Sequence, residues 1–498
     1  MSESANEILE GLDESQRAAA QSVDGPVRIV AVAGAGKTRT ITRRIAYACA
    51  SEQWDANRVL AVTFSIKAAN EMRERLDALH VPAGVRASTF HSAALRQMRE
   101  AWPQICEGPF PEVADSKEPL VSRALFRFSN QEPLKQAVAD VGQEIDWCKV
   151  SLVDSKNYAR VCAATHRQPP AGLEPEQFAQ VYDQYEAEKT SRMQIDFNDI
   201  LLLACHVLNA FPDVAEQIRR SIGWLTVDEY QDVSPLQHLL MKNWLGSNRN
   251  VCVVGDPAQT IYSFAGATSY YLEYFAKEFE PLAADIALST DYRSVAPIVG
   301  YANRVLAQSQ FRDGYIKLNS GRDGGARVIS HIYDSDAQEA QAVAVQIQRI
   351  IAHGGKASDC AVLTRVSGQQ AIIGQALRAA GIPYQVRRNS GWQSSALAGP
   401  VAASTSNEGV EKLGVSAGRV TISTIHASKG LEYKHVFVVG LSDGLLPYKP
   451  STDAQKVEEE RRVLYVAMTR AEDTLHLSFA KRADEQTAYV RQLSRFLH

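Results

Sequence analysis

A small-residue loop between a predicted strand and a predicted helix has the residue types that bind a triphosphate. The apolar run Val27–Val32 leads into the loop Ala33-Gly34-Ala35-Gly36-Lys37-Thr38-Arg39. Small residues let backbone N–H groups turn toward phosphate oxygens, and the N-terminus of the following helix adds its dipole. Lys37 would reach the β- and γ-phosphates, and the hydroxyl of Thr38 would bind Mg²⁺. The strict pattern has Gly where this chain has Ala31, and a solvated turn with an exposed lysine is the alternative.

An acidic pair at the end of another apolar run supplies the groups that ATP hydrolysis needs. Asp228 and Glu229 follow directly after Leu225–Val227. A carboxylate must complete the Mg²⁺ shell, and a second group must orient or deprotonate the attacking water. We assign the first task to Asp228 and the second to Glu229. Such a pair alone is more often a solvated strand end, but beside a phosphate loop an ATP site is favoured.

Composition and charge place the chain among ordinary globular proteins. Its 498 residues are 45% hydrophobic and 22% charged, which argues against disorder and fibrous structure. The net charge of −4 gives no overall positive field, so a nucleic-acid site must be a local groove. The seven cysteines are scattered without CxxC spacing, which fits reduced thiols. Since the N-terminus is polar and the apolar runs are short, we expect a soluble, cytoplasmic protein with no membrane partner.

Apolar runs separated by helical patterns predict an α/β fold with parallel sheets. These runs are Val27–Val32, Val59–Phe64, Leu225–Val227, Val251–Val254, Ala361–Leu363, Val420–Ser423 and Val436–Val439. The first four end in polar or glycine-containing turns, and ligands of open α/β sheets bind beyond the carboxyl ends of strands. Strand signals are missing between residues 92 and 192, which predicts a helical insertion. A second α/β unit begins near Leu288, and its interruption at 387–418 exceeds ordinary loop length.

An ordered series of segments resembles the motifs of UvrD/Rep/PcrA-type helicases of superfamily 1A. Motifs II, III, V and VI are resembled by Val227–Asp232, Val254–Tyr262, Thr424–Tyr433 and Glu458–Ala471. The Q motif and motifs Ia, Ib and IV are resembled by Leu12–Gln16, Val62–Ala69, Thr89–Ser92 and Asp291–Ser294. The segments follow the family's order from residue 12 to residue 471, which makes the series far more specific than any single member.

The resemblance implies two RecA-like, parallel-sheet P-loop domains that close on ATP, with a helical insertion in the first. We expect the first domain over 1–91 and 193–285, the insertion over 92–192, the second domain over 286–386 and 419–498, and a short remnant over 387–418. That remnant stands where the full-length helicases carry a whole helical 2B domain.

The resemblance also implies further contacts with the nucleotide. Arg293 and Arg470 would be arginine fingers that stabilise the transition state, and Gln259 would sense the γ-phosphate. Around the nucleoside the expected contacts are Arg39 and Tyr292 on the faces of adenine, Gln16 on its edge and Glu432 on the ribose. Taken alone, Tyr292 would be read as a core aromatic and Arg470 as a surface charge.

A set of aromatic and imidazole side chains is expected along a single-stranded DNA track. Bases can stack on such rings without sequence preference. The resemblance places five of them there: Phe64, His91, Tyr262, Phe264 and His426. Two positions depart from the family pattern. Ala265 stands where many relatives have Arg, and Asn198 replaces an Asp in the segment Asp196–Asp199.

These residues predict an ATP-dependent DNA helicase and translocase, with 3′ to 5′ polarity taken from the resemblance. Its substrate would be single-stranded DNA or DNA with a 3′ single-stranded tail. Because so little stands in place of 2B, we expect poor unwinding alone and possible reliance on a nuclease or other protein partner. One alternative is a nucleotide-gated DNA-end sensor, or the helicase subunit of a nuclease-containing anti-phage complex such as the Gabija type. A P-loop kinase or metabolic ATPase unrelated to DNA is the third reading.

Overall fold

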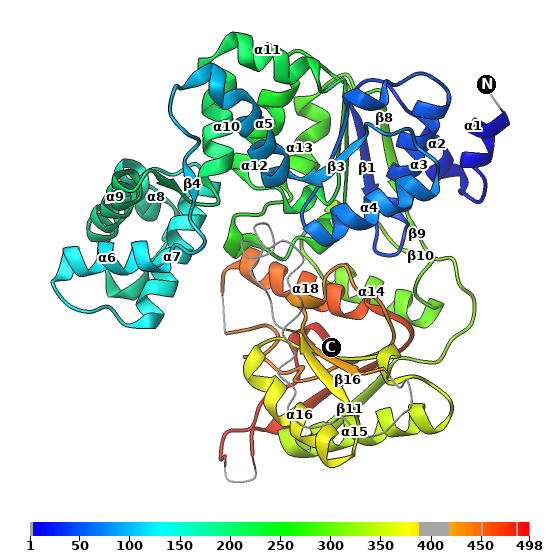
Figure 1. Cartoon of the computed structure of the whole chain (residues 1–498). Coiled ribbons are helices and arrows are strands. Elements are labelled where there is room, and N and C mark those ends of the chain that lie inside the picture. Colours follow the sequence, from blue (N-terminus) through cyan, green and yellow to red (C-terminus); the bar gives the residue numbers. More distant parts are fainter. Residues whose placement is uncertain (1–2, 388–417, 450–451, 485–486, 498) are drawn as a thin grey trace.

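The computed structural model, which describes residues 3–387, 418–449, 452–484 and 487–497, contains two α/β domains and a helical insertion (Figure 1). Each α/β domain is built on a six-stranded sheet in which every strand pairing is parallel. The first domain lies above the second in Figure 1, and the insertion extends to one side of the first. The predicted fold class is confirmed.

The first sheet contains the strands that lead into the two predicted parts of the phosphate site, which are the loop 33–39 and the acidic pair Asp228 and Glu229. Its order is β3 (Arg86–Thr89), β2 (Val59–Thr63), β6 (Trp224–Val227), β7 (Val251–Gly255), β1 (Val27–Ala31) and β8 (Ala284–Leu288). Helices α1 (Glu3–Ile8), α2 (Glu14–Gln21), α3 (Lys37–Ala50) and α4 (Ile66–Ala78) lie on one side. The other face is packed by α5 (Phe90–Ile105), α10 (Asp199–Ala210), α11 (Pro212–Arg220), α12 (Pro235–Leu245) and α13 (Tyr270–Glu278). Since β2 and β7 are buried along their whole length, both faces of the sheet are covered.

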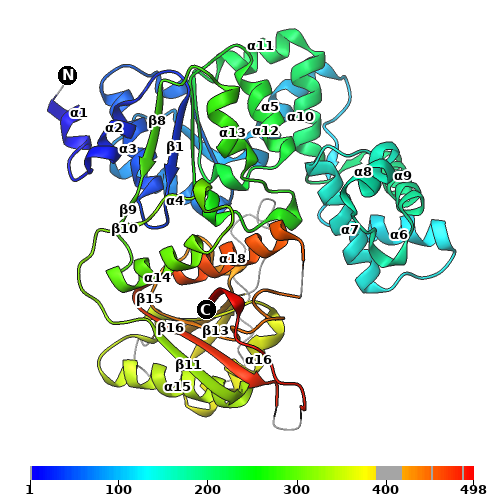
Figure 2. The ribbon, with the colours of Figure 1, turned by 180° about the vertical axis from the view of Figure 1, so that it is seen from behind.

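The second sheet has the order β11 (Ile329–Ser335), β16 (Ala471–Arg482), β15 (Tyr433–Val438), β12 (Cys360–Thr364), β14 (Val420–Thr424) and β13 (Tyr384–Arg387). Helices α15 (Asp336–Ala352) and α16 (Gln370–Ala379) cover its outer face. Helices α14 (Ala296–Ala307) and α18 (Ala454–Met468) cover the inner face and lie between the two domains (Figure 2). One continuous cluster of buried apolar side chains joins these two helices to α2, α3 and β1 of the first domain.

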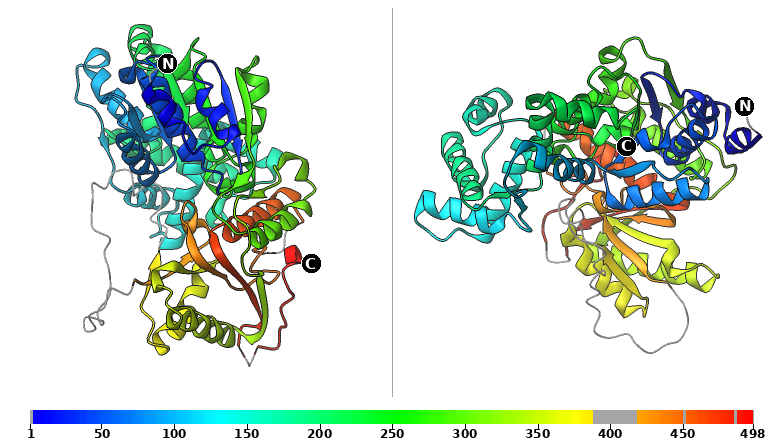
Figure 3. Two further views of the ribbon diagram at one scale, coloured as in Figure 1. Left: turned by 90° about the vertical axis from the view of Figure 1, so that its right-hand side faces the viewer. Right: turned by 45° about the horizontal axis from the view of Figure 1, so that its top comes forward.

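The insertion has a small core of its own. Helices α6 (Glu118–Ser129), α7 (Lys135–Val150), α8 (Ser155–Thr165) and α9 (Pro175–Ser191) bury a separate apolar cluster. The insertion stands to one side of the two α/β domains (Figure 3). A two-stranded pairing of β4 (Glu112–Val113) with β5 (Gln194–Ile195) closes its base. Helix α5, although it lies mostly within the predicted range 92–192, packs into the core of the first domain. A second short pairing, β9 (Thr290–Asp291) with β10 (Asn319–Ser320), lies in the connection between the domains.

All seven predicted apolar runs correspond to strands, and the strands that the sequence did not predict are mainly the sheet edges. Edge strands β3 and β8 are partly exposed and β11 and β13 are mostly exposed, so these strands lack a continuous apolar run. Almost the whole predicted remnant over 387–418 lies outside the described residues. None of the described helices combines the length and the apolar character that crossing a membrane requires.

A buried carboxyl group of the second domain gives a pH-dependent stability. Glu339 of α15 is 3% exposed and its Oε1 accepts hydrogen bonds from the Ser478 hydroxyl (2.6 Å) and the Gly440 N–H (3.1 Å). Burial raises the pKa of this carboxyl to about 7. Because the folded-state pKa exceeds the unfolded value, the stabilisation is complete at low pH and is lost as the pH rises through about 7.

Glu339→Gln, which keeps the acceptor oxygen and removes the charge, should therefore stabilise the second domain at pH 8. The expected gain is about 2–3 kcal/mol at pH 8 and should shrink toward zero near pH 4. Thermal unfolding of both proteins across this pH range measures the difference. Asp313→Asn, at a fully exposed side chain, is the control that should show no such trend. A variant that unfolds at or below the temperature of the parent at pH 8 would contradict the assignment.

Candidate active site and nucleic-acid groove

The loop after β1 is shaped by two glycines in the left-handed region of backbone space. Gly34 has φ +71° and Gly36 has φ +75°, and α3 begins directly afterwards at Lys37. A Cβ on Gly34 would lie 1.9 Å from the Asp291 carboxylate, so only glycine fits this close approach. The Tyr292 N–H also donates to the Gly34 carbonyl at 3.1 Å. The loop is thereby held against the segment that leads into the second domain.

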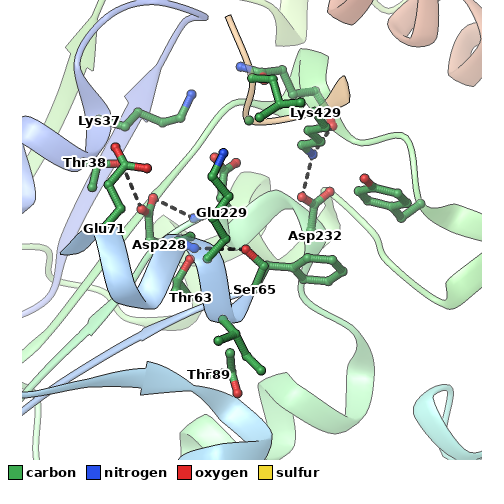
Figure 4. Close-up of a pocket in the computed structure, with 18 of the residues that line it drawn as sticks. Lys37, Thr38, Thr63, Ser65, Glu71, Thr89, Asp228, Glu229, Asp232 and Lys429 are labelled. Carbon is green, nitrogen blue, oxygen red and sulfur yellow. Dashed lines mark hydrogen bonds and ion pairs between the residues drawn. The ribbon is translucent and has the colours of Figure 1, made fainter. Parts of the chain in front are cut away.

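The acidic pair lies at the carboxyl edge of the same sheet, two strands away from the loop. The Thr38 hydroxyl donates to Asp228 Oδ2 at 3.3 Å, which joins the two predicted metal-binding residues (Figure 4). Burial and the neighbouring charge of Glu229 raise the pKa of Asp228 to about 7. A hydroxyl beside a carboxylate is an oxygen donor set of the kind that Mg²⁺ prefers.

Glu229 is held in a strained but charged state. Its φ of +53° is in the left-handed region, which is rare for a non-glycine residue and typical of functional sites. Burial opposes ionisation, but the positive charges of Lys37 and Lys429 outweigh it and lower the pKa of Glu229. The Gln231 side chain donates to the Glu229 carboxylate. A fixed carboxylate that stays ionised beside Lys37 can accept a proton from water.

Two arginines of the second domain reach the same space from the opposite side. Arg470 is 2% exposed, and its Nη2 lies 3.4 Å from Gln259 Oε1 of the first domain. Burial and the charge of Arg293 lower the pKa of Arg470 to about 10, so it remains protonated at neutral pH. Arg293 donates from Nη1 to the Thr469 carbonyl at 2.9 Å and forms an ion pair with Glu432. Their guanidinium groups are therefore fixed before a nucleotide binds.

The residues expected around adenine form the outer end of this space. Gln16 is 1% exposed and donates to the Ala35 carbonyl of the phosphate loop at 3.0 Å. Arg39 donates to the Gly11 carbonyl at 2.8 Å. Tyr292 is 44% exposed, and its hydroxyl donates to the Asp13 carboxylate. An exposed ring at this place excludes the reading of Tyr292 as a core aromatic.

Contacts across the two domains include residues that the sequence analysis did not single out. Lys429 Nζ lies 2.5 Å from the Asp232 carboxylate and 2.6 Å from the Gln259 carbonyl (Figure 4). Its ammonium also lies 5.2 Å from the centre of the Tyr262 ring. Asp232 lies in the segment that resembles motif II, and Lys429 lies in the segment that resembles motif V. That position is the sequence feature that could have identified both as site residues. The Tyr262 hydroxyl of the first domain also donates to the His426 carbonyl of the second domain at 2.9 Å.

The aromatic side chains predicted for DNA gather beside these contacts. The rings of Phe64 and Tyr262 are stacked, with centres 5.5 Å apart and planes at 14°. Phe264, which is 47% exposed, contacts Tyr262 edge-on at 6.0 Å and His426 at 5.8 Å. His91 is buried and stacks on Phe197 at 3.8 Å.

Both histidines of this group are neutral. Burial lowers the pKa of His91 to about 3, and burial with the charges of Arg365 and Lys429 lowers that of His426 to about 3. Any contact of these rings with a polynucleotide is therefore stacking or neutral hydrogen bonding and not ion pairing. The cations that line this part of the cavity include Lys429 and Arg387, whose Nε donates to the Ala427 carbonyl at 3.0 Å.

One cavity of about 960 Å³ runs from the phosphate loop to the aromatic cluster. All predicted site residues except Ala33 line it. Ala33 is 1% exposed, and its N–H faces the Tyr465 hydroxyl at 3.4 Å. Of the two departures from the motif pattern, Ala265 lines the cavity and Asn198 is buried beside a residue that does. The Asn198 amide donates to Asp146 Oδ1 at 3.0 Å, where an Asp would repel that carboxylate.

Comparison with known proteins gives the family of the chain. Residues 12–280 match the model of the UvrD/REP helicase N-terminal domain, and residues 286–391 and 401–482 match that of the UvrD-like helicase C-terminal domain. The chain is 36% identical to the ATP-dependent DNA helicase UvrD2 of Mycobacterium tuberculosis (strain ATCC 25618 / H37Rv), over 582 aligned positions that cover 100% of the chain and 83% of the relative. It is 31% identical to the ATP-dependent DNA helicase PcrA of Bacillus subtilis (strain 168), over 77% of the chain and 51% of that relative. With both domains matched in order, the chain belongs to the UvrD/REP helicase family.

Proposed function

We propose that this member of the UvrD/REP helicase family hydrolyses ATP between its two α/β domains and uses the energy to move 3′ to 5′ along single-stranded DNA. The observation that carries the proposal is the composite cavity. Lys37 and Glu229 of the first domain and Arg470 of the second line the same space. A P-loop kinase with a single α/β domain does not need an arginine from a second sheet. Because residues of two domains line one cavity here, a motor is favoured over the kinase alternative.

The chemistry follows from the fixed charges. Lys37 and the loop N–H groups bind the phosphates, while Glu229 orients the attacking water and accepts its proton. Arg293 and Arg470 stabilise the charge that develops on the transferred phosphoryl group. Thr38 and Asp228 would hold Mg²⁺, which supplies positive charge to the phosphate oxygens when bound.

The same cavity offers a route from hydrolysis to movement. Lys429 touches Asp232 beside the acidic pair, the Gln259 carbonyl, and the ring of Tyr262 in the aromatic cluster. A change in the position of the second domain around the phosphates therefore displaces the surface on which bases would stack. Alternating grip by the two domains would convert this displacement into steps along a strand.

A comparison of polynucleotides as activators of the ATPase tests the proposal. Relative to the rate without polymer, ATP turnover should rise strongly with single-stranded DNA and little with duplex DNA or RNA. Streptavidin bound to a biotinylated 3′ or 5′ end should be stripped from the 5′ end alone, in an ATP-dependent manner. DNA-stimulated turnover without displacement would identify a nucleotide-gated end sensor. Turnover indifferent to every polymer would identify a metabolic ATPase.

Poor unwinding by the isolated protein is the second part of the proposal. Only residues 388–419 separate β13 from β14, at the place where the full-length helicases of the resemblance carry a whole 2B domain. We expect slow displacement of long duplexes alone and faster displacement with a nuclease or other protein partner. Displacement at a rate that matches the ATPase of the protein alone would contradict this part.

Phe64→Ala should weaken binding of single-stranded DNA. Loss of one stacking ring costs about 1–3 kcal/mol, which corresponds to a five- to hundredfold weaker affinity. Fluorescence anisotropy with labelled oligo(dT) measures the change, and affinity should fall as salt rises. Phe126→Ala, at a ring that is 43% exposed on α6 and away from the cavity, is the control. Unchanged affinity in Phe64→Ala would discredit the aromatic cluster as the DNA site.

A further inference from the structure

The helical insertion contributes a wall to the cavity. Gln143, Asp146 and Trp147 of α7 all line it, together with the aromatic cluster of the first domain. Their spacing of three and four residues places them on one face of the helix. In Figures 1 and 2, α7 is an insertion helix that faces the body of the molecule. None of these three residues belongs to the motifs that the resemblance assigns to DNA.

The ring of Trp147 is held in place from behind. The Arg167 guanidinium lies 3.4 Å from the centre of the ring, which is stacking distance. Arg167 is itself fixed by two hydrogen bonds to the buried Glu144 carboxylate, at 2.6 and 2.7 Å. The Tyr158 hydroxyl donates to the same carboxylate at 2.8 Å. A half-buried tryptophan supported in this way presents a rigid surface to the cavity.

A buried ion network fixes α7 relative to the first domain. Lys149, the second residue after Trp147, lies 2.6 Å from Asp199 and also pairs with Asp196. Lys189 of α9 pairs with the same two carboxylates, and Glu186 of α9 pairs with both lysines. Because α10 begins at Asp199 and packs in the core of the first domain, the network ties the insertion to that domain. Movement of α7 would break buried ion pairs, which is costly.

The face of α7 that lines the cavity carries one acidic residue, which in the sequence alone would be expected to repel a polyanion. The acidic residue on it, Asp146, is paired with Lys117 and accepts a hydrogen bond from Asn198. Its negative charge is therefore offset. Gln143 is exposed and offers amide donors to the cavity.

We propose that Trp147 is a stacking surface for a base of single-stranded DNA, supplied by the insertion. The strand would pass from the Phe64 and Tyr262 cluster to the wall formed by α7. This inference rests on the proposed function, because it extends the same groove. It adds a binding residue from the helical insertion to those of the two α/β domains. This residue lies next to the ion network that fixes the insertion.

Binding of labelled oligo(dT) to the full chain tests the inference. Trp147→Ala should weaken affinity about tenfold, which is the loss of one stacked base, while Trp147→Phe should stay within about threefold. Trp102→Ala is the matched control, because Trp102 packs edge-on against Phe110 outside the cavity. Thermal unfolding shows whether each variant is folded. Photo-crosslinking of the unmodified protein to oligo(dT) that contains 5-iododeoxyuridine should label a peptide of α7.

The outcomes separate this inference from the proposed function. If Phe64→Ala weakens binding but Trp147→Ala stays within twofold of the parent, the inference is wrong and the proposed function stands. Equal weakening in Trp147→Ala and Trp147→Phe would show a purely structural role and also overturn it. If Trp147→Ala does not fold, the crosslink decides, and absence of α7 from the labelled peptides overturns the inference. A parent protein that does not bind the oligonucleotide would instead refute the proposed function.

Discussion

Replacing Glu229 by Gln is expected to slow ATP hydrolysis by about 10²- to 10⁴-fold, which is the usual contribution of a general base. The amide has nearly the same shape but cannot accept the proton of the attacking water. ATP binding should change little, since Lys37 and the loop N–H groups make the phosphate contacts. A variant that binds ATP without hydrolysing it should accumulate in an ATP-bound, DNA-bound state.

Phosphate release with saturating single-stranded DNA measures the loss, and equilibrium binding of labelled ATP checks that the site is intact. Glu216→Gln is the matched control, because Glu216 pairs with Arg220 on the surface of α11. Hydrolysis at the parent rate in Glu229→Gln would remove Glu229 from its assigned role and point to another carboxylate of the site.

Arg470→Ala should reduce turnover by about 10³- to 10⁵-fold, the range expected for an arginine finger. In the structure the Arg470 guanidinium is already beside Gln259 and faces the cavity that Lys37 lines. Arg470→Lys should restore little of the activity, since an ammonium cannot make the planar, forked contact of a guanidinium. Affinity for ADP, which lacks the γ-phosphate, should be nearly unchanged in both variants.

Because Arg470 is buried, its variants need a separate check of folding. Thermal unfolding should show two intact domains, and Arg220→Ala on the surface is the control for loss of an arginine. A folded Arg470→Ala protein that retains more than a tenth of the parent turnover would contradict the role of Arg470 as a finger.

Strand prediction worked for the centres of the sheets and not for their edges. Val59–Thr63 and Val251–Gly255 are buried on both faces, and an unbroken apolar run shows this in the sequence. The edge strand Ile329–Ser335 is mostly exposed, so its polar residues hide it from a pattern of apolar runs. The strand next to it, Ala471–Arg482, is largely buried, but polar residues alternate with its apolar ones and leave no unbroken apolar run.

The sequence predicted which motifs contribute residues to the site, but it did not predict which of these residues contact one another. Resemblance places Lys37, Glu229 and Arg470 in motifs, and the fold brings all three to one cavity. The pairing of Asp232 with Lys429 depends on how two domains close, which no local pattern in either segment encodes. Trp147 lies in the insertion, where the motif series offers no guide, and its place in the cavity follows from the packing of α7. The roles of these residues remain predictions.

The structure of the protein with ADP, Mg²⁺ and aluminium fluoride is the most direct test of a shared ATP site. Aluminium fluoride occupies the place of the transferred phosphoryl group. We predict that the Lys37 ammonium and the Arg470 guanidinium both lie within hydrogen-bond distance of the fluoride, one from each sheet. A complex in which the analogue is bound by the first domain while Arg470 stays turned away from it would contradict the account.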